Sequence, residues 1–401
     1  MSKKSIGIIR EGKNPPDSRV PFTPTHCQNI IKNFETTIKV ESSPARCIKD
    51  DQYSKAGFEP TNDISDCDII FGVKEVPINM LVPNKTHFFF SHTIKAQPYN
   101  RKLLLACLEK NIRLIDYEPL TFENGQRVVG FGRWAGIVGA HNGLLTWGRR
   151  TGEFDLKAAH DCKDYKELVG QYKSIIHKPL KIAVTGNGRV AKGSIELLKL
   201  IGVKEVSAKD YLEKEFDHTV FSQIEIKDYV KHTEYTDFEV AHFFKYPAQY
   251  ESSFKPFTKV TDLFINAVYW DPSSPVFFTH NDMKQPDFRI KVIADVTCDI
   301  KGSIPSTVRP STIDNPIYGY SKNEEKETEP HQEGVIDVMA VDNLPNELPL
   351  DASESFGDVL LENIIPELFK EQSDLLDRAT ICKNGRLTEK FSYLQDFVDG
   401  K

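Results

Sequence analysis

Three ionisable residues follow short apolar segments of the chain, and their side chains could transfer protons. Lys74 follows CDIIFGV, His92 follows THFFFS, and Glu118 lies just after IRLID. Burial at the end of a strand lowers the pKa of a lysine toward the range of a general base, and histidine titrates near neutral pH. A neighbouring carboxylate would keep one of these two groups charged. Each residue alone is more often an ordinary solvated side chain, but the three together predict an acid–base site.

The apolar segments that carry these residues are predicted to be strands of one parallel sheet. Strands that alternate with helical stretches are typical of this arrangement. Because parallel strands end at the same edge of a sheet, the three side chains would lie on one rim. Thr25 is expected to cap the first helix. The predicted elements are strands at 5–9, 37–41, 67–73, 86–91 and 112–116 and a helix at 99–110.

A second candidate site lies in residues 180–202, LKIAVTGNGRVAKGSIELLKLIG, which predict a strand, a tight turn and a helix. Gly186 permits the sharp turn, and Gly188 lets the backbone approach a ligand. Small Ala191 and Gly193 would let the helix pack tightly on its strand. The free N–H groups and the positive dipole end of such a helix suit a pyrophosphate. The segment therefore predicts a dinucleotide site, and a glycine-rich packing turn is the alternative.

The residues after this helix bear on the choice of dinucleotide. A strand is predicted at 203–208, and Asp210 follows it, 24 residues beyond Gly186. A carboxylate at this position accepts hydrogen bonds from the ribose hydroxyls of NAD. Lys209 could instead pair with the 2′-phosphate of NADP, although neighbouring residues of a strand face opposite sides. The sequence predicts NAD, with NADP as the alternative.

Two domains are expected, both of class α/β and doubly wound. The second would contain the strands 181–185, 203–208, 262–268, 290–296 and 335–341, and its ligands would bind at their carboxyl ends. Residues 211–257 show no clear period. A helix is predicted at 133–150, and another beyond Pro349 is expected to return to the first domain. The expected limits are 1–134 plus 346–401 for the first domain and 135–345 for the second.

Bulk properties exclude several classes of protein. The 401 residues carry a formal charge of −7 and have no outstanding basic stretch, so nucleic acid is not an expected partner. Seven scattered cysteines without a Cys-x-x-Cys pair indicate neither a metal site nor a disulfide framework. No apolar run approaches the ~18 residues of a membrane helix, and the first residues do not resemble a signal peptide. A cytoplasmic protein without a membrane partner is expected.

Three arginines at element boundaries could bind carboxylates. Arg19, Arg127 and Arg133 lie in predicted loops or next to them. The planar guanidinium forms two parallel hydrogen bonds with a carboxylate. Ordinary surface ion pairs are the alternative for each of them.

The whole chain resembles a known family. It is similar to the lysine-forming saccharopine dehydrogenases and the lysine–ketoglutarate reductases, within the alanine dehydrogenase and transhydrogenase superfamily. This resemblance implies two Rossmann-like domains with an active site in the cleft between them. It also implies interconversion of saccharopine with L-lysine and 2-oxoglutarate through an imine that a nicotinamide hydride reduces. The segments that carry it are GVKEVP, FFFSHTIKAQ, IRLIDYE, RVVGFGRWAG, TGNGRVAKG, INAVYW, IADVTCDIKGSI and VDNLPNELPLDASESFGD.

The resemblance also implies roles for individual residues. Lys74 would be the general base and His92 the general acid, with Glu118 modulating Lys74. Val190 stands where the fungal enzymes have a cysteine, so a disulfide is excluded there. Substrate contacts would be Arg19, Gln97, Arg127, Phe131, Thr297, Cys298 and Asp299. Cofactor contacts would be Gly186, Gly188, Arg189, Val190, Asp210, Tyr269, Val296, Val341, Asp342, Asn343 and Leu344.

Two other functions remain open at this point. An alanine dehydrogenase-like enzyme would share the fold, but the SHTIKAQ and DNLPNELP segments favour the larger saccharopine-type ligand. A non-catalytic nucleotide-binding regulator would not need Lys74, His92 and Glu118. A relative of the reductase domain would stand alone, because no second catalytic domain follows residue 401. The expected assembly is a monomer or a small homo-oligomer.

Overall fold

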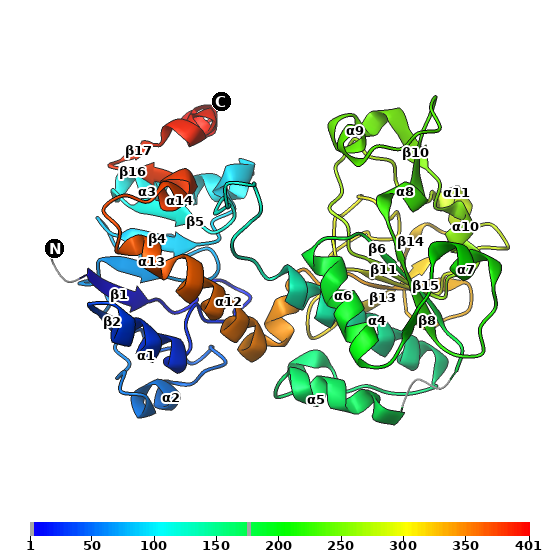
Figure 1. Ribbon diagram of the computed structural model, residues 1–401, viewed down its shortest axis with the longest axis horizontal. Helices are drawn as coiled ribbons and strands as arrows, with labels where there is room; N and C mark the ends of the chain where they lie inside the picture. The colour runs from blue at the N-terminus through cyan, green and yellow to red at the C-terminus, as the bar shows by residue number, and fades with distance from the viewer. Residues whose placement is uncertain (1–3, 175–177) are drawn as a thin grey trace. The chain divides into compact units, whose positions relative to one another are not determined.

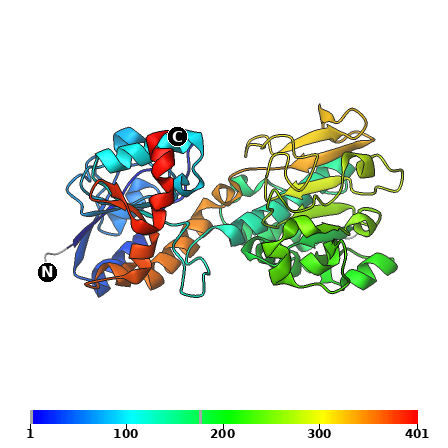
Figure 2. The same ribbon diagram turned by 90° about the horizontal axis from the view of Figure 1, so that it is seen from above.

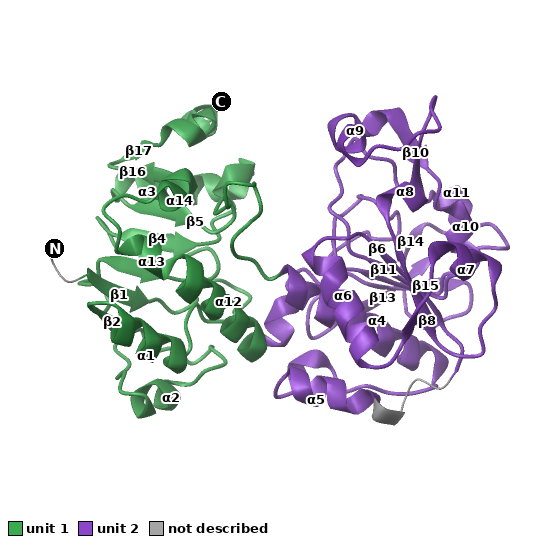
Figure 3. Cartoon of the chain, in the orientation of Figure 1, with its two compact units in different colours: residues 1–131, 349–401 green, residues 132–348 purple. Residues whose placement is uncertain are grey.

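The computed structural model describes residues 4–174 and 178–401. The chain divides into two compact units, coloured separately in Figure 3. Unit 1 consists of Met1–Phe131 and Pro349–Lys401, and unit 2 of Gly132–Leu348. Each unit contains one large, mostly parallel sheet with helices, which confirms the predicted α/β class.

Unit 1 contains a seven-stranded sheet in the order β17-β16-β5-β4-β3-β1-β2. The five predicted strands, β1 to β5, are confirmed, and they pair in parallel. β16 and β17 come from the C-terminal segment and were not predicted. β16 pairs antiparallel with β5, so the C-terminal segment extends the sheet. The strands are β1 Lys4–Ile8, β2 Thr36–Val40, β3 Ile69–Phe71, β4 Thr86–Phe89, β5 Arg113–Asp116, β16 Thr380–Lys383 and β17 Arg386–Leu387.

The helices of unit 1 come from both chain segments. Thr23, not Thr25, caps the first helix, because Pro24 fits the first helical position and the Thr23 hydroxyl accepts a hydrogen bond from the His26 backbone. Figures 1 and 2 show the C-terminal helix beside α3, and Arg101 Nε donates to the Phe397 carbonyl at 2.7 Å. The helices are α1 Pro24–Asn33, α2 Asp50–Lys55, α3 Arg101–Glu109, α12 Pro349–Asn363, α13 Ile365–Leu368, α14 Asp374–Ala379 and α15 Gln395–Asp399.

Aromatic side chains join the two segments of unit 1 in one core. Phe71 and Phe88 stack across β3 and β4 with ring centroids 4.4 Å apart. Phe356 of α12 meets Tyr117 edge-on at 5.1 Å and stacks on Phe131 at 4.6 Å. Such ring pairs stabilise a core beyond the area that they bury. The core of unit 1 therefore depends on α12.

Unit 2 contains an eight-stranded sheet in the order β14-β13-β15-β12-β11-β6-β8-β7. All strands are parallel except β13, which runs antiparallel to both of its neighbours, β15 and β14. The strands are β6 Lys181–Thr185, β7 Lys204–Glu205, β8 Val220–Ile224, β11 Leu263–Asn266, β12 Val292–Asp295, β13 Ile317–Ser321, β14 Lys326–Thr328 and β15 Val335–Met339.

One prediction about unit 2 is wrong. The strand expected at 203–208 is only the two-residue edge strand β7, and Asp210 lies in a helix. Residues 211–257 form regular elements, and one of them, β8, takes the place next to β6. A separate pair consists of β9 Val230–His232 and β10 Tyr250–Ser252. The helices are α4 Gly132–Thr151, α5 Tyr165–Gly170, α6 Arg189–Leu200, α7 Ala208–Glu213, α8 Ile226–Tyr229, α9 Val240–Lys245, α10 Lys255–Thr258 and α11 His280–Met283.

Helices α4 and α6 cross with their backbones in direct contact. A Cβ atom on Gly136 would lie 1.9 Å from the Val190 carbonyl oxygen, and one on Gly193 would lie 2.0 Å from the Arg133 carbonyl oxygen. Ser194 Oγ donates to the Gly136 carbonyl at 2.9 Å. Gly193 thus serves the contact with α4 and not the expected contact with its own strand. The crossing fixes α6, whose first turn follows the glycine turn.

A methyl group at this crossing should destabilise the protein. In Gly136→Ala the new Cβ meets backbone that cannot move away without shifting α6, so we expect the free energy of unfolding to fall by about 3 kcal/mol. The control is Gly170→Ala, where a Cβ has no neighbour within 4 Å. Urea unfolding followed by circular dichroism measures both. Equal stability of the two variants would contradict the close crossing.

Candidate functional site

The three candidate proton-transfer residues of unit 1 follow neighbouring parallel strands. Lys74 follows β3, His92 follows β4, and Glu118 follows β5. These strands are adjacent and parallel, so the three residues leave the sheet at the same carboxyl edge. Their side chains do not form one bonded group: His92 contacts Glu75, Glu118 contacts Arg127 and Lys95, and Lys74 is held through its backbone N–H by Glu11.

Lys74 is largely buried at the end of β3. Burial and the nearby positive charge of Arg19 lower the pKa of its ammonium group. Its backbone N–H donates to Glu11 Oε2 at 2.9 Å, and the N–H of Val73 donates to Glu11 Oε1 at 2.6 Å. The Glu11 carboxyl group therefore fixes the turn that presents Lys74. Glu11 lies in an irregular loop, where no sequence pattern predicts this role.

The side chain of Glu11 loses its proton less readily than an ordinary glutamate. Burial raises its pKa to about 8, and the neighbouring charge of Asp17 adds to this effect despite the two backbone hydrogen bonds. At neutral pH the group therefore holds a proton next to Lys74.

His92 is held by a carboxylate that the sequence analysis did not select. His92 Nδ1 lies 2.6 Å from Glu75 Oε1, and Lys13 Nζ donates to Glu75 Oε2 at 2.8 Å. Burial opposes the ionisation of Glu75, but the hydrogen bonds from His92 and Lys13 lower its pKa to about 2. An ionised Glu75 therefore faces the imidazole at physiological pH. This contact orients the ring and leaves Nε2 for another partner.

The backbone at His92 adopts an unusual conformation. Its φ of +54° lies in the left-handed region, which costs energy for a residue other than glycine. Ser91, just before it, donates its backbone N–H to Asp116 Oδ2 at 2.8 Å, and Asp116 Oδ1 accepts from the Glu118 backbone at 2.7 Å. Buried Asp116 thus ties the ends of β4 and β5 together and supports the strained turn.

Glu118 forms a cluster of its own. Its Oε1 accepts a hydrogen bond from Arg127 at 2.8 Å and lies 3.7 Å from Lys95 Nζ. Its buried Oε2 has no hydrogen-bond partner within the described part of the chain. Glu75, and not Glu118, is therefore the carboxylate bonded to the proposed acid. Arg127 and Lys95 both remain about half exposed.

The remaining candidate substrate-binding residues of unit 1 differ in how far they are exposed to solvent. Arg19 is buried and forms two hydrogen bonds with Asp17, one of them from Nε at 2.9 Å. Its guanidinium lies 4.1 Å from the ring centre of Phe131. Gln97 is exposed at the start of a short 3-10 helix. The buried Arg19–Asp17 pair therefore packs on the Phe131 ring and lies near Lys74.

The glycine turn of unit 2 has the geometry of a dinucleotide site. Gly186 has a φ of +98°, and a Cβ there would lie 2.8 Å from the Ala267 carbonyl oxygen. Gly188 caps α6 without a side-chain cap, and a Cβ there would meet no atom within 4 Å. Arg189 and Val190 form the first turn of α6. The helix therefore presents uncapped N–H groups toward open space, as a pyrophosphate requires.

A pocket adjoins this turn. Its volume of about 140 Å³ lies among the turn, α8, α9 and the loop after β11. Tyr269 lines it and is 86% exposed. Apolar and aromatic walls of this kind suit the flat ring of a nucleotide base. The other lining residues include Ile226, Tyr229, Phe243, Val268, Trp270 and Phe277.

The other unit 2 candidates follow β12 and β15 at the same edge. Val296 follows β12, and Thr297 Oγ1 donates to the Val268 carbonyl at 2.7 Å. Cys298 has a φ of +53° and directs its Sγ to the Ala340 carbonyl at 3.0 Å. Asp299 continues this loop. The candidates after β15 are buried Val341 and Leu344 and the more exposed Asp342 and Asn343.

A buried carboxylate anchors the loop after β15. Glu347 is 1% exposed and ends the 3-10 helix Leu344–Glu347. Its Oε1 accepts a hydrogen bond from Asn142 of α4 at 2.8 Å, and its Oε2 lies 3.5 Å from His160 Nδ1. This contact raises the pKa of His160. The loop is thereby fixed to α4.

Asp210 does not occupy the strand end that the sequence analysis assigned to it. It lies in the first turn of α7, where its carboxylate pairs with Lys214 at 3.0 Å. The strand next to β6 is β8, which ends at Ile224. The Gly186 N–H donates to the Ile224 carbonyl at 3.2 Å, and Gln223 Nε2 donates to the Gly186 carbonyl at 2.8 Å. Glu225 is therefore the acidic residue at the strand end beside the glycine turn.

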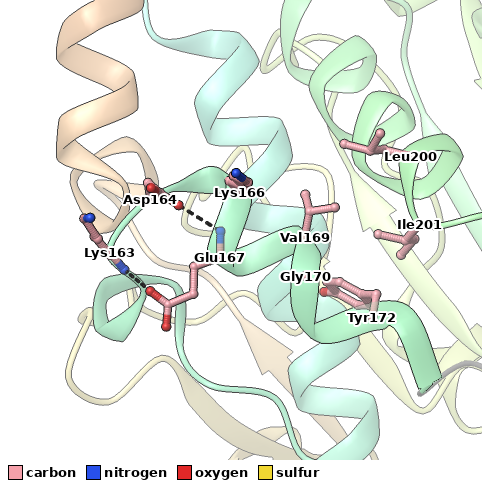
Figure 4. Close-up of a pocket in the computed structure, with 9 residues that line it drawn as sticks. All are labelled: Lys163, Asp164, Lys166, Glu167, Val169, Gly170, Tyr172, Leu200 and Ile201. Atoms are coloured by element: carbon pink, nitrogen blue, oxygen red, sulfur yellow. Dashed lines mark hydrogen bonds between the residues drawn. The ribbon is translucent and has the colours of Figure 1, made fainter.

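A further hollow lies between α5 and the end of α6, shown in Figure 4. Its side chains serve local structure. The Glu167 backbone N–H donates to Asp164 at 2.8 Å, and the Lys163 backbone N–H donates to Glu167 at 2.7 Å. None of the candidate site residues lines it.

No group of His, Cys, Asp and Glu side chains among the described residues could hold a metal ion. All seven cysteines are free thiols. No helix in this part of the chain has the length and apolar character needed to cross a membrane.

Comparisons with known proteins agree with the fold. The family described as alanine dehydrogenase/PNT, N-terminal domain, matches residues 7–138. A solved structure of L-alanine dehydrogenase superposes with a TM-score of 0.64 at 15% identity and covers 99% of each chain.

Two relatives are similar to this chain over nearly its whole length. The mitochondrial alpha-aminoadipic semialdehyde synthase of Mus musculus is 30% identical over an alignment that covers 100% of this chain and 48% of the relative, so this chain spans about half of its length. The saccharopine dehydrogenase (NAD(+), L-lysine-forming) of Emericella nidulans is 26% identical, with 94% of this chain and 98% of the relative covered. The chain is thus similar over nearly its whole length to lysine-forming saccharopine dehydrogenases and alpha-aminoadipic semialdehyde synthases, and its residues 7–138 match the alanine dehydrogenase/PNT N-terminal domain.

Proposed function

We propose that the protein interconverts saccharopine with L-lysine and 2-oxoglutarate, with a nicotinamide coenzyme. The observation that carries this proposal is the pair of Lys74 and His92 at one sheet edge, with Glu75 bonded to His92 at 2.6 Å. Similarity to these relatives supports the choice of substrates. The glycine turn of unit 2 supports the choice of coenzyme, since Gly188 leaves room for a pyrophosphate.

Lys74 is the proposed general base. Because burial and Arg19 lower its pKa, more of its side chain is a neutral amine than in an exposed lysine. A neutral amine can accept the proton that the secondary amine of saccharopine loses on oxidation. The bound coenzyme would accept the accompanying hydride.

His92 is the proposed general acid. The Glu75 carboxylate at Nδ1 orients the imidazole ring and leaves Nε2 as the nitrogen that can pass a proton to the substrate. In the lysine-consuming direction that proton would go to the hydroxyl group that leaves as water when the lysine ε-amine and the ketone condense. In reverse, the same imidazole would take a proton from the attacking water.

Cationic side chains are the proposed partners of the substrate carboxylates. Saccharopine carries three carboxylates, and a planar guanidinium binds such groups in pairs of hydrogen bonds. Arg127 and Lys95 keep about half of their surface exposed beside Glu118. Buried Arg19 is paired with Asp17 and contributes chiefly its field at Lys74.

We also propose NAD as the preferred coenzyme, with Glu225 and not Asp210 as the residue that selects it. Glu225 follows β8, the strand that pairs with β6, and a carboxylate there repels a 2′-phosphate. Both carboxylates pair with a lysine, Asp210 with Lys214 at 3.0 Å and Glu225 with Lys227 at 2.8 Å, so the choice depends on position, and Asp210 lies beyond the edge strand β7. The Emericella nidulans relative is named as an NAD(+) enzyme, which agrees with this choice.

Removal of either proton-transfer group should slow turnover. We expect Lys74→Met and His92→Gln each to lower kcat about 100-fold or more, while coenzyme affinity changes little. The assay is NADH oxidation with lysine and 2-oxoglutarate at saturation. The control is Lys102→Met, which removes an exposed lysine of α3. Wild-type kcat in both site variants would remove these residues from the mechanism.

The proton on Glu11 should make stability depend on pH. With a pKa of about 8 in the folded protein against an ordinary value of 4.5, Glu11 takes up a proton on folding at any pH between these two values. The free energy of unfolding should therefore fall as pH rises from about 5 to 8. We expect urea unfolding of Glu11→Gln to show a smaller fall over this range. The same slope in wild type and variant would show that Glu11 is already ionised.

Coenzyme selection should respond to Glu225. In Glu225→Ala the ratio of kcat/KM for NADH over NADPH should fall about tenfold, as expected for the loss of charged hydrogen bonds to the ribose. The matched control is Asp210→Ala, which removes a carboxylate of α7 and should leave the ratio within about twofold. If Asp210→Ala changed the ratio and Glu225→Ala did not, Asp210 and not Glu225 would be the residue that selects the coenzyme.

A further inference from the structure

A second hollow of unit 2 lies at the opposite edge of its sheet from the glycine turn. The turn follows the carboxyl end of β6, whereas this hollow lies where β12 and β15 begin, and all three strands run in one direction. Its volume is about 780 Å³, within the range of small-molecule sites. Lys322 reaches it from the end of β13, and Arg150 reaches it from the last turn of α4.

The lining is dominated by cations. Five basic and two acidic side chains line the hollow. Three of the cations are already paired, Arg150 with Asp337 at 3.0 Å, Arg289 with Asp262 at 2.8 Å, and Lys259 with Asp287 at 2.8 Å. The lining residues with charge are Arg150, Lys259, Arg289, Lys291, Lys322, Asp287 and Glu333.

Two lysines remain without such a partner. Within the described ranges neither Lys291 nor Lys322 has a carboxylate at ion-pair distance. Lys322 is partly buried, and its ammonium lies 5.9 Å from the ring centre of Phe288. Burial and the positive charge of Arg150 lower the pKa of Lys322. An anion between these cations would relieve the repulsion and replace lost solvation.

The paired side chains would hold such an anion in place. Asp337 is fully buried in β15 and also accepts hydrogen bonds from the backbone and ring of His331, the ring contact being 2.7 Å. Arg150 in addition donates to the Gln332 carbonyl at 3.0 Å. The Arg150 guanidinium is therefore fixed where it lines the hollow, with its charge shared with Asp337, so it needs no further ordering to meet an anion.

We propose that this hollow binds a small polyanion that carries phosphate or several carboxylate groups. The site differs in position and in chemistry from the glycine turn, where backbone N–H groups and not lysines would meet the ligand. Its occupation does not depend on the proposed reaction.

The test is calorimetric titration of the full chain with inorganic pyrophosphate and with citrate at low salt. We expect binding of at least one of them, weakened at least tenfold in Lys291→Gln/Lys322→Gln. The control is Lys199→Gln/Lys231→Gln, which removes the same charge from exposed positions of unit 2 and should bind like wild type. The citrate and pyrophosphate arms distinguish carboxylate from phosphate ligands.

A second measurement uses the wild-type protein alone, in case the double variant does not fold. Acetylation of lysines followed by mass spectrometry should show Lys291 and Lys322 protected by the bound anion, and Lys199 and Lys231 unprotected. Absence of binding to wild type at millimolar anion would overturn the proposal. So would unchanged affinity in the double variant, or protection that leaves Lys322 unaffected, because the anion would then bind elsewhere.

Discussion

The close crossing of α4 and α6 is the contact on which the proposed dinucleotide site depends. With Gly136 and Gly193 the two backbones meet directly, and no side chain other than hydrogen fits between them. The crossing sets the direction of α6, and thereby the direction in which its uncapped N–H groups point. Helix α4 also carries Asn142, which holds Glu347 and the loop after β15. One helix thus positions two of the loops at the carboxyl edge of the unit 2 sheet.

The electrostatic environment of the candidate site in unit 1 depends on which partners its carboxyl groups contact. Glu75 receives hydrogen bonds from His92 and Lys13 and is ionised, whereas buried Glu11 receives only backbone hydrogen bonds and keeps its proton. The first orients the His92 ring, and the second adds no negative charge beside Lys74. The two carboxyl groups that contact the proposed acid and base thus differ in charge state, because their hydrogen-bond partners differ.

The sequence predicted those elements whose signals are local and strong. Strands with continuous apolar runs and the glycine turn are confirmed because burial alone selects them. The position of β8 could not be predicted, because the order of strands in a sheet depends on tertiary pairing, and Asp210 was therefore assigned to a strand end that belongs to Ile224 and Glu225. The alternation of residue types in TVFSQIEI was the sequence signal from which β8 could have been predicted. Glu75 was missed because its contact with His92 depends on a left-handed turn that no periodicity reveals.

In the proposed reaction, one hydride transfer and two proton transfers join lysine and 2-oxoglutarate. The most direct measurement is mass spectrometry of the product formed from these two substrates with NADH deuterated at the transferred position, with pyruvate and ammonia as the comparison. We expect saccharopine that carries one deuterium on the carbon derived from the ketone. Deuterated alanine from pyruvate and ammonia, with no saccharopine from lysine and 2-oxoglutarate, would contradict it.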